Sequence, residues 1–177
     1  SVHYLGTLKN GYMWTVDYTI EELLTGIDES FEGNIRKAVE KYYETVSEMA
    51  EKYQPPIIGH LDLFNKNNKD NILFDERDKW YVEAVKKCLN VIKNTSSVIE
   101  INTGGIARNY SNEQYPSTLI LKMIKGKNIP IMVNSDAHTA DGLACKFTDM
   151  YKLTNDIGFE HLVYLTKNGW EKQEILY

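Results

Sequence analysis

Three of the chain's four histidines, His3, His60 and His138, each follow a short apolar stretch. Asp136 lies two positions before His138, and side chains two apart in an extended segment point to the same side. Imidazole and carboxylate together suit zinc, manganese or iron, ions that polarise a phosphoryl oxygen and lower the pKa of a bound water. The pattern therefore predicts a divalent-metal cluster that hydrolyses a phosphate ester, with His3, His60, Asp136 and His138 as metal ligands and with Asp136 and His138 also as catalytic residues.

Each histidine also has a simpler interpretation. A lone histidine at a strand end is more often a hydrogen-bonded structural residue than a metal ligand. Three histidines at equivalent positions, one of them beside an aspartate, favour the metal site. His161 does not share this pattern, and we expect it to be a structural or surface residue.

Three further polar residues lie close to these positions in the sequence. Arg108 follows the Gly104-Gly105 turn, and its forked guanidinium matches phosphate oxygens, so it is the candidate catalytic phosphate clamp. The alternative is a solvated loop arginine. Asp62 follows His60 by two positions and either orients a ligating imidazole from the second shell or caps a turn. Glu100 either lines the site or serves as a structural hydrogen-bonding partner.

The elements that position these residues alternate along the chain. Apolar runs predict strands at 1–5, 57–60, 97–102, 130–135 and 161–165, with a loop at 9–15. Helical spacing predicts helices at 28–53, 78–93, 116–125 and 146–157. Such alternation indicates an α/β fold with parallel strands and outer crossover helices, in which active-site groups gather at the carboxyl ends of the strands. Five strands are few for a closed barrel, so either the sheet is open or the rest of the barrel lies outside this chain.

Composition narrows the class of protein. The 177 residues are 42% hydrophobic and 25% charged, which predicts one domain over residues 1–177. A net charge of -5 argues against a protein that binds nucleic acid by general electrostatic attraction, and it requires a local positive cluster to meet an anionic substrate. The sequence has neither a long apolar run nor a signal pattern, so we expect a soluble cytoplasmic protein without a membrane partner, whose two cysteines are reduced thiols.

Five segments together resemble the histidinol-phosphate phosphatases of the PHP (polymerase and histidinol phosphatase) superfamily. They are Ser1-Val2-His3-Tyr4, Gly59-His60-Leu61-Asp62-Leu63, Glu100-Ile101-Asn102-Thr103-Gly104-Gly105 with Arg108, Tyr115-Pro116-Ser117, and Asn134-Ser135-Asp136-Ala137-His138. Their order and spacing cover the whole chain. The resemblance implies a distorted (β/α)7 barrel and a three-metal centre of zinc, manganese or iron that hydrolyses L-histidinol phosphate to L-histidinol and phosphate, in histidine biosynthesis.

The same resemblance assigns roles to individual residues. It implies that His3, His60, Asp136 and His138 are metal ligands and that Arg108 binds phosphate. It also implies a His-x-His strand and further histidine and glutamate ligands before the Ser-Val-His segment, which are absent here. We therefore expect residues 1–177 to be a single, partial PHP-like domain, whose open barrel edge favours self-association.

Two other functions stay open at this stage. One is a non-catalytic PHP-like module that binds a metal or a partner. The other keeps the metal-dependent chemistry but acts on another phosphorylated substrate. A small phosphorylated molecule such as histidinol phosphate remains the favoured ligand.

Overall fold

The computed structural model describes residues 1–175 as a mixed α/β fold with three small sheets. The strands are β1 (Tyr4–Thr7), β2 (Met13–Thr15), β3 (Ile57–Ile58), β4 (Val98–Asn102), β5 (Ile131–Asn134), β6 (His161–Thr166) and β7 (Gly169–Glu174). The α-helices are α1 (Ile20–Phe31), α2 (Ile35–Tyr53), α3 (Lys79–Ile92), α4 (Gly104–Ala107), α5 (Thr118–Gly126) and α6 (Phe147–Ile157). Short 3-10 helices are η1 (Leu63–Asn67), η2 (Lys69–Asn71) and η3 (Ala140–Gly142).

The central sheet has the strand order β3-β4-β5, and both pairings are parallel. The β3–β4 connection contains α3, and the β4–β5 connection contains α4 and α5. All five residues of β4 are buried, as expected for a middle strand covered on both faces. The prediction of parallel strands with crossover helices is therefore confirmed for these three strands.

The first and last predicted strands do not join this sheet, because each pairs with its own sequence neighbour in an antiparallel hairpin. β1 pairs with β2, which lies within the segment predicted as a loop, and β6 pairs with β7. The turn at Asn10-Gly11 explains the first hairpin: Gly11 has a φ of 88°, a conformation that glycine adopts without strain. The prediction of five alternating parallel strands was wrong at both ends.

The segment 28–53, predicted as one helix, contains the end of α1 and the whole of α2. Glu32 and Gly33 both have positive φ values, 57° and 73°, which end α1. The Asn34 side chain then accepts a hydrogen bond from the Lys37 amide at 3.1 Å and caps the start of α2. The apolar periodicity continues across this break, so periodicity alone did not reveal it.

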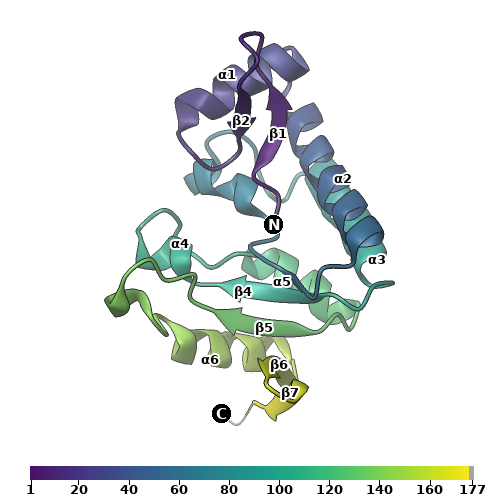
Figure 1. Cartoon of the computed structure of the whole chain (residues 1–177), viewed down its shortest axis with the longest axis vertical. Coiled ribbons are helices and arrows are strands. Elements are labelled where there is room, and N and C mark those ends of the chain that lie inside the picture. The colour runs from purple at the N-terminus through teal and green to yellow at the C-terminus, as the bar shows by residue number, and fades with distance from the viewer. Residues whose placement is uncertain (176–177) are drawn as a thin grey trace.

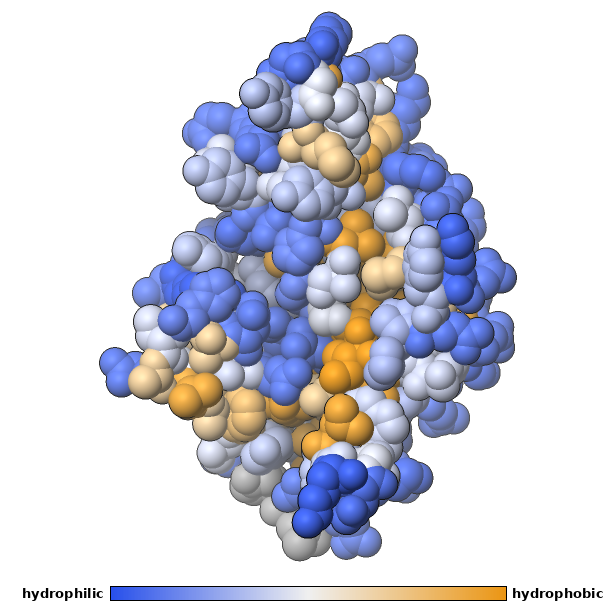
Figure 2. Space-filling view, viewed as in Figure 1, coloured by the Kyte–Doolittle hydropathy of each residue, from blue (hydrophilic) through white to orange (hydrophobic). Residues whose placement is uncertain are grey.

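The core lies between the central sheet and the helices, and it extends beneath the first hairpin. Tyr43 of α2 and Tyr81 of α3 are fully buried, and their hydroxyls are 2.9 Å apart. Trp14 of β2 is buried against α1. The face drawn in Figure 2 is largely hydrophilic and carries a broken apolar stripe. Within residues 1–175, no helix is both long enough and apolar enough to cross a membrane.

Candidate functional site

The carboxyl ends of the central strands bring the candidate residues to one side of the sheet. β4 and β5 run toward the side where α4 and the segment after β5 lie (Figure 1). His60 follows β3, Arg108 follows α4, and Asp136 follows β5. This is the convergence that parallel strands predict.

His3 reaches the same region by a different route. It precedes β1 rather than ending a strand, and its carbonyl accepts a hydrogen bond from the Val16 amide at 2.9 Å. The imidazoles of His3 and His60 meet edge to face, with ring centroids 4.9 Å apart. Asp17 Oδ2 lies 3.2 Å from His3 Nδ1 and can orient that ring. The sequence reading missed Asp17, whose only signal was its place in the loop after the hairpin.

His60 has the environment of a neutral imidazole. Burial is the main cause that lowers its pKa, and the nearby His3 lowers it further. Its Nδ1 is buried without a hydrogen-bond partner among the described residues. Its φ is 29° and that of Asp136 is 47°, backbone conformations that non-glycine residues rarely adopt and that cluster at functional sites. A deprotonated, unpartnered ring nitrogen suits a metal ligand.

Asp136 connects the arginine with the third histidine. Arg108 Nη1 donates to the Asp136 carbonyl at 2.7 Å, and Nη2 donates to Oδ2 at 3.1 Å. A Cβ at Gly104 would lie 2.7 Å from Arg108 Nη2, so glycine there leaves room for the guanidinium. His138 Nε2 is 3.8 Å from Asp136 Oδ1, and the His138 side chain is 69% exposed. Arg108 is therefore held at the site rather than extended into solvent.

The candidate ligands form two pairs, His3–His60 and Asp136–His138. Within residues 1–175, however, no three histidine, cysteine, aspartate or glutamate side chains are grouped so that they could hold a metal ion. The donor types fit zinc, manganese or iron, but the two pairs are an incomplete ligand set.

Glu100 braces the strand ends beneath the two pairs. Its Oε2 accepts hydrogen bonds from the His60 amide at 2.9 Å and from Asn102 Nδ2 at 3.0 Å. Its Oε1 accepts one from Asn134 Nδ2 at 3.0 Å. The carboxylate thus links β4 to β5 and to the turn after β3. This agrees with the interpretation of Glu100 as a structural hydrogen-bonding partner.

Asp62 is fully buried and turns toward α5. Its Oδ2 accepts hydrogen bonds from the Ser117 amide at 2.8 Å and from Asn65 Nδ2 at 3.3 Å. These contacts fix η1 to the start of α5, so Asp62 positions a helix, a role that neither sequence alternative named. A contact between Asp62 and a ligating imidazole stays a prediction. His161 begins β6 and lines a separate pocket with Glu160 and Glu174.

The burial of Asp62 leads to a prediction about stability. Burial and the neighbouring Glu76 raise its pKa well above the usual range, so the charged form destabilises the metal-free fold. The stabilisation from this group is complete below its unfolded pKa and is lost as the pH rises through the raised folded pKa. We expect Asp62→Asn to increase the free energy of unfolding of chelator-treated protein by roughly 1 kcal/mol at pH 7. Urea unfolding at pH 7 and pH 4 measures this, and an equal gain at both pH values would contradict it.

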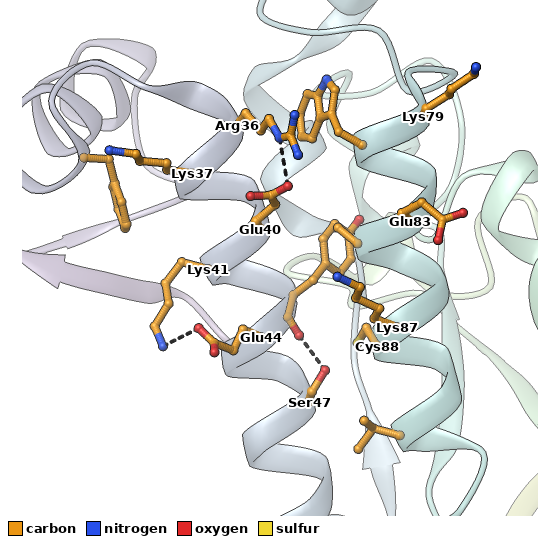
Figure 3. Close-up of a pocket in the computed structure, with 15 residues that line it drawn as sticks. Arg36, Lys37, Glu40, Lys41, Glu44, Ser47, Lys79, Glu83, Lys87 and Cys88 are labelled. Carbon is orange, nitrogen blue, oxygen red and sulfur yellow. Dashed lines mark hydrogen bonds and ion pairs between the residues drawn. The ribbon is translucent and has the colours of Figure 1, made fainter.

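A wide, open groove elsewhere on the molecule lies between α2 and α3 (Figure 3). It encloses about 1050 Å³ and is bordered by residues of both charges, including Arg36, Glu40, Lys41 and Glu44. Arg36 pairs with Glu40 and Lys41 with Glu44 along α2. None of the candidate ligands lines this groove, so its size does not mark the reactive site.

Comparisons with known proteins find relatives named as histidinol-phosphatases. The chain is 32% identical to the histidinol-phosphatase of Bacillus subtilis over 148 residues, which are 79% of this chain and 52% of that protein. It is 28% identical to a Deinococcus radiodurans protein, named as a probable histidinol-phosphatase, over 89% of this chain and 53% of that protein. No protein-family model matches the chain. The chain spans about half the length of the two curated relatives.

A solved structure shares the fold. A Listeria monocytogenes protein assigned as a histidinol phosphatase superposes with a TM-score of 0.70 and 22% identity. The match covers 83% of this chain and 55% of that protein. At this identity the likeness concerns the fold alone. The α/β arrangement of this chain corresponds to about half of the Listeria monocytogenes structure.

Proposed function

The chain belongs to the histidinol-phosphatase family over the part of those proteins that it spans, and we propose that it carries part of a metal-dependent site that hydrolyses L-histidinol phosphate. The sheet would then be one portion of a PHP-type barrel. The products would be L-histidinol and phosphate, as in histidine biosynthesis.

One observation supports this proposal: the His3–His60 pair and the Asp136–His138 pair both lie near strand ends of the central sheet, where His60 follows β3 and Asp136 follows β5. The four residues come from three segments that lie far apart in the sequence, and His60 and Asp136 have positive φ values. We propose that the four side chains bind divalent ions such as zinc, manganese or iron, together with further ligands from outside this chain. Bound ions of this kind polarise phosphoryl oxygens and lower the pKa of a water.

The chain's own residues would orient the reaction. Asp17 would hold the His3 ring, and Glu100 would hold the His60 backbone through its amide. Arg108 reaches Asp136 with two of its nitrogens, and this contact supports a role for its guanidinium beside the bound phosphoryl group. Its fixed fork would bind phosphate oxygens and stabilise the charge that develops on them.

Phosphate release from L-histidinol phosphate tests the proposal. We expect the purified whole protein to release phosphate with Mn²⁺ or Zn²⁺, to lose this activity with EDTA and to regain it when metal is restored. Elemental analysis of the same preparations gives the metal content. Metal bound without phosphate release would contradict the hydrolase.

The incomplete ligand set within residues 1–175 favours a second candidate, a non-catalytic PHP-like module. This module would use the His3–His60 and Asp136–His138 pairs for structural metal binding, or it would bind a partner. Elemental analysis and phosphate release together separate the two: two or more ions per whole protein with phosphate release favour the hydrolase, and absence of phosphate release favours the module.

Arg108→Lys gives a second prediction for the proposed site. Lysine keeps the charge but lacks the planar fork, so the bidentate contact with a phosphoryl group is lost. We expect the inhibition constant for inorganic phosphate to rise about tenfold, which corresponds to about 1.4 kcal/mol, while the bound metal content is unchanged. Inhibition kinetics with phosphate measure the effect, and an unchanged constant would contradict the clamp role.

A further inference from the structure

Lys66 of η1 lies beside the residues that hold His3 in place. Its ammonium donates a hydrogen bond to the carbonyl of Asp17. Asp17 in turn lies 3.2 Å from the His3 ring, measured from Oδ2 to Nδ1. The neighbouring Asn67 donates to the Val16 carbonyl at 3.0 Å, so two contacts fix η1 to this segment. Lys66 is therefore a cation held next to a candidate metal ligand.

Tyr110 connects Lys66 with Arg108. Nζ of Lys66 lies 4.5 Å from the centroid of the Tyr110 ring, and Cζ of Arg108 lies 5.7 Å from the same centroid. Cations at these distances are attracted by the quadrupole of an aromatic ring. The two cations come from different elements, Lys66 from η1 and Arg108 from the end of α4, yet they share one aromatic side chain.

The contacts of Lys66 and Arg108 form a continuous series from the His3–His60 pair to the Asp136–His138 pair. The residues between the two pairs are Asp17, Lys66, Tyr110 and Arg108. Both cations of this series are thus placed between the two pairs of candidate ligands. The chain has a net charge of -5, so local positive charge of this kind is what an anionic substrate requires.

Lys66 keeps donors that an anion can use. An ammonium has three N–H donors, and the Asp17 carbonyl accepts from one of them. Among the described residues Lys66 forms no ion pair, so a carboxylate partner does not neutralise its charge. The Lys66 side chain is only partly buried, and Tyr110 beside it is 46% exposed. A ligand from solvent can therefore approach this ammonium.

From these contacts we propose that Lys66 is a second phosphate-binding residue, which acts with Arg108 on the phosphoryl group of the substrate. The inference rests on the proposed function, because it adds a residue to the same site. Lysine binds phosphate oxygens as a point charge, whereas the arginine fork gives two directed bonds. Tyr110 is a positioning residue that holds both cations. L-histidinol phosphate also carries an amine, which the two cations repel, so they fix which end of the substrate faces them.

Calorimetric titration of the Mn²⁺-loaded whole protein with inorganic phosphate tests Lys66 without depending on turnover. Lys66→Gln removes the charge but keeps an N–H donor for the Asp17 carbonyl. We expect the Kd for phosphate to rise about tenfold, since a hydrogen bond to a charged group is lost, while metal content and Tm stay unchanged. Lys66→Arg restores the charge and is expected to recover most of the phosphate affinity.

Three further variants make the test specific. Lys93→Gln makes the same change at an exposed lysine that ends α3, before β4 begins, and is expected to leave the phosphate Kd unchanged. Tyr110→Leu removes the shared ring, and we expect it to raise the Kd about threefold. Tyr110→Phe keeps the ring face and is expected to retain the original Kd, which a role of the hydroxyl would not allow.

An unchanged phosphate Kd in Lys66→Gln would overturn the proposal, as would absence of phosphate binding in the unmodified protein. A weaker Kd accompanied by loss of metal or by a lower Tm would also overturn it, because Lys66 would then support the fold instead of the ligand. Phosphate binding that depends on Lys66 in a protein that does not hydrolyse L-histidinol phosphate would confirm the role of Lys66 and contradict the proposed function.

Discussion

Asp136→Asn is expected to lower metal-dependent phosphate release from L-histidinol phosphate by more than about 100-fold, since it removes a proposed ligand rather than a group behind one. The substitution keeps the size of the side chain but removes the negative charge that faces His138 and Arg108. It therefore weakens metal binding and removes the ion pair with Arg108, while the hydrogen bond from Arg108 Nη1 to the Asp136 carbonyl stays possible. Phosphate release and elemental analysis of the same preparation measure the two effects.

A nearby aspartate provides the matched control for this variant. Asp141 lies in η3 and is exposed, and we expect Asp141→Asn to keep both activity and metal content. Arg108→Lys separates the two effects, because it is expected to weaken phosphate binding without loss of metal. Full activity of Asp136→Asn would remove this residue from the proposed ligand set.

Sequence periodicity predicted the parts of the fold in which one pattern dominates. β4 is buried along its whole length, and α3 and α5 have clear apolar stripes, so the existence of these three elements was predictable. Their alternation along the chain also predicted that the strands of the central sheet are parallel. The first hairpin was not predicted, because its strands of four and three residues are too short to show alternation. The second was missed because β7, unlike β6, is almost entirely polar and exposed. The Asn10-Gly11 pair was the available signal for the first hairpin, but it was interpreted as a loop.

Residue type and strand ends predicted the neighbourhood of the site but not its detailed contacts. His60 and Asp136 were placed correctly after parallel strands, whereas the pairing of Arg108 with Asp136 depends on the turn of α4. Asp17 reaches His3 across 14 positions from a loop, where no periodicity applies. Such contacts depend on tertiary packing, which a single sequence does not display.

Gly26→Ala is expected to have a large effect on stability, because α1 packs directly on the indole of Trp14. A Cβ at Gly26 would lie 2.2 Å from Trp14 Cδ2, too close for any real contact. The indole cannot move easily: it is fully buried, its Nε1 donates to Ser30 Oγ at 3.1 Å, and its ring contacts Phe31. Alanine gains helix propensity, but overpacking outweighs this gain, and we expect a net loss of about 2 kcal/mol or more in the free energy of unfolding.

Gly126→Ala is the matched control, since it makes the same change in another helix where the added Cβ has no neighbour within 4 Å. There the helix propensity of alanine acts without a clash, so the free energy of unfolding is expected to stay unchanged or to rise by up to about 1 kcal/mol. Urea unfolding of both variants gives the difference. Equal stabilities would mean that Trp14 does not pack beneath α1, and the position of the first hairpin, which carries His3 at its start, would then have to be revised.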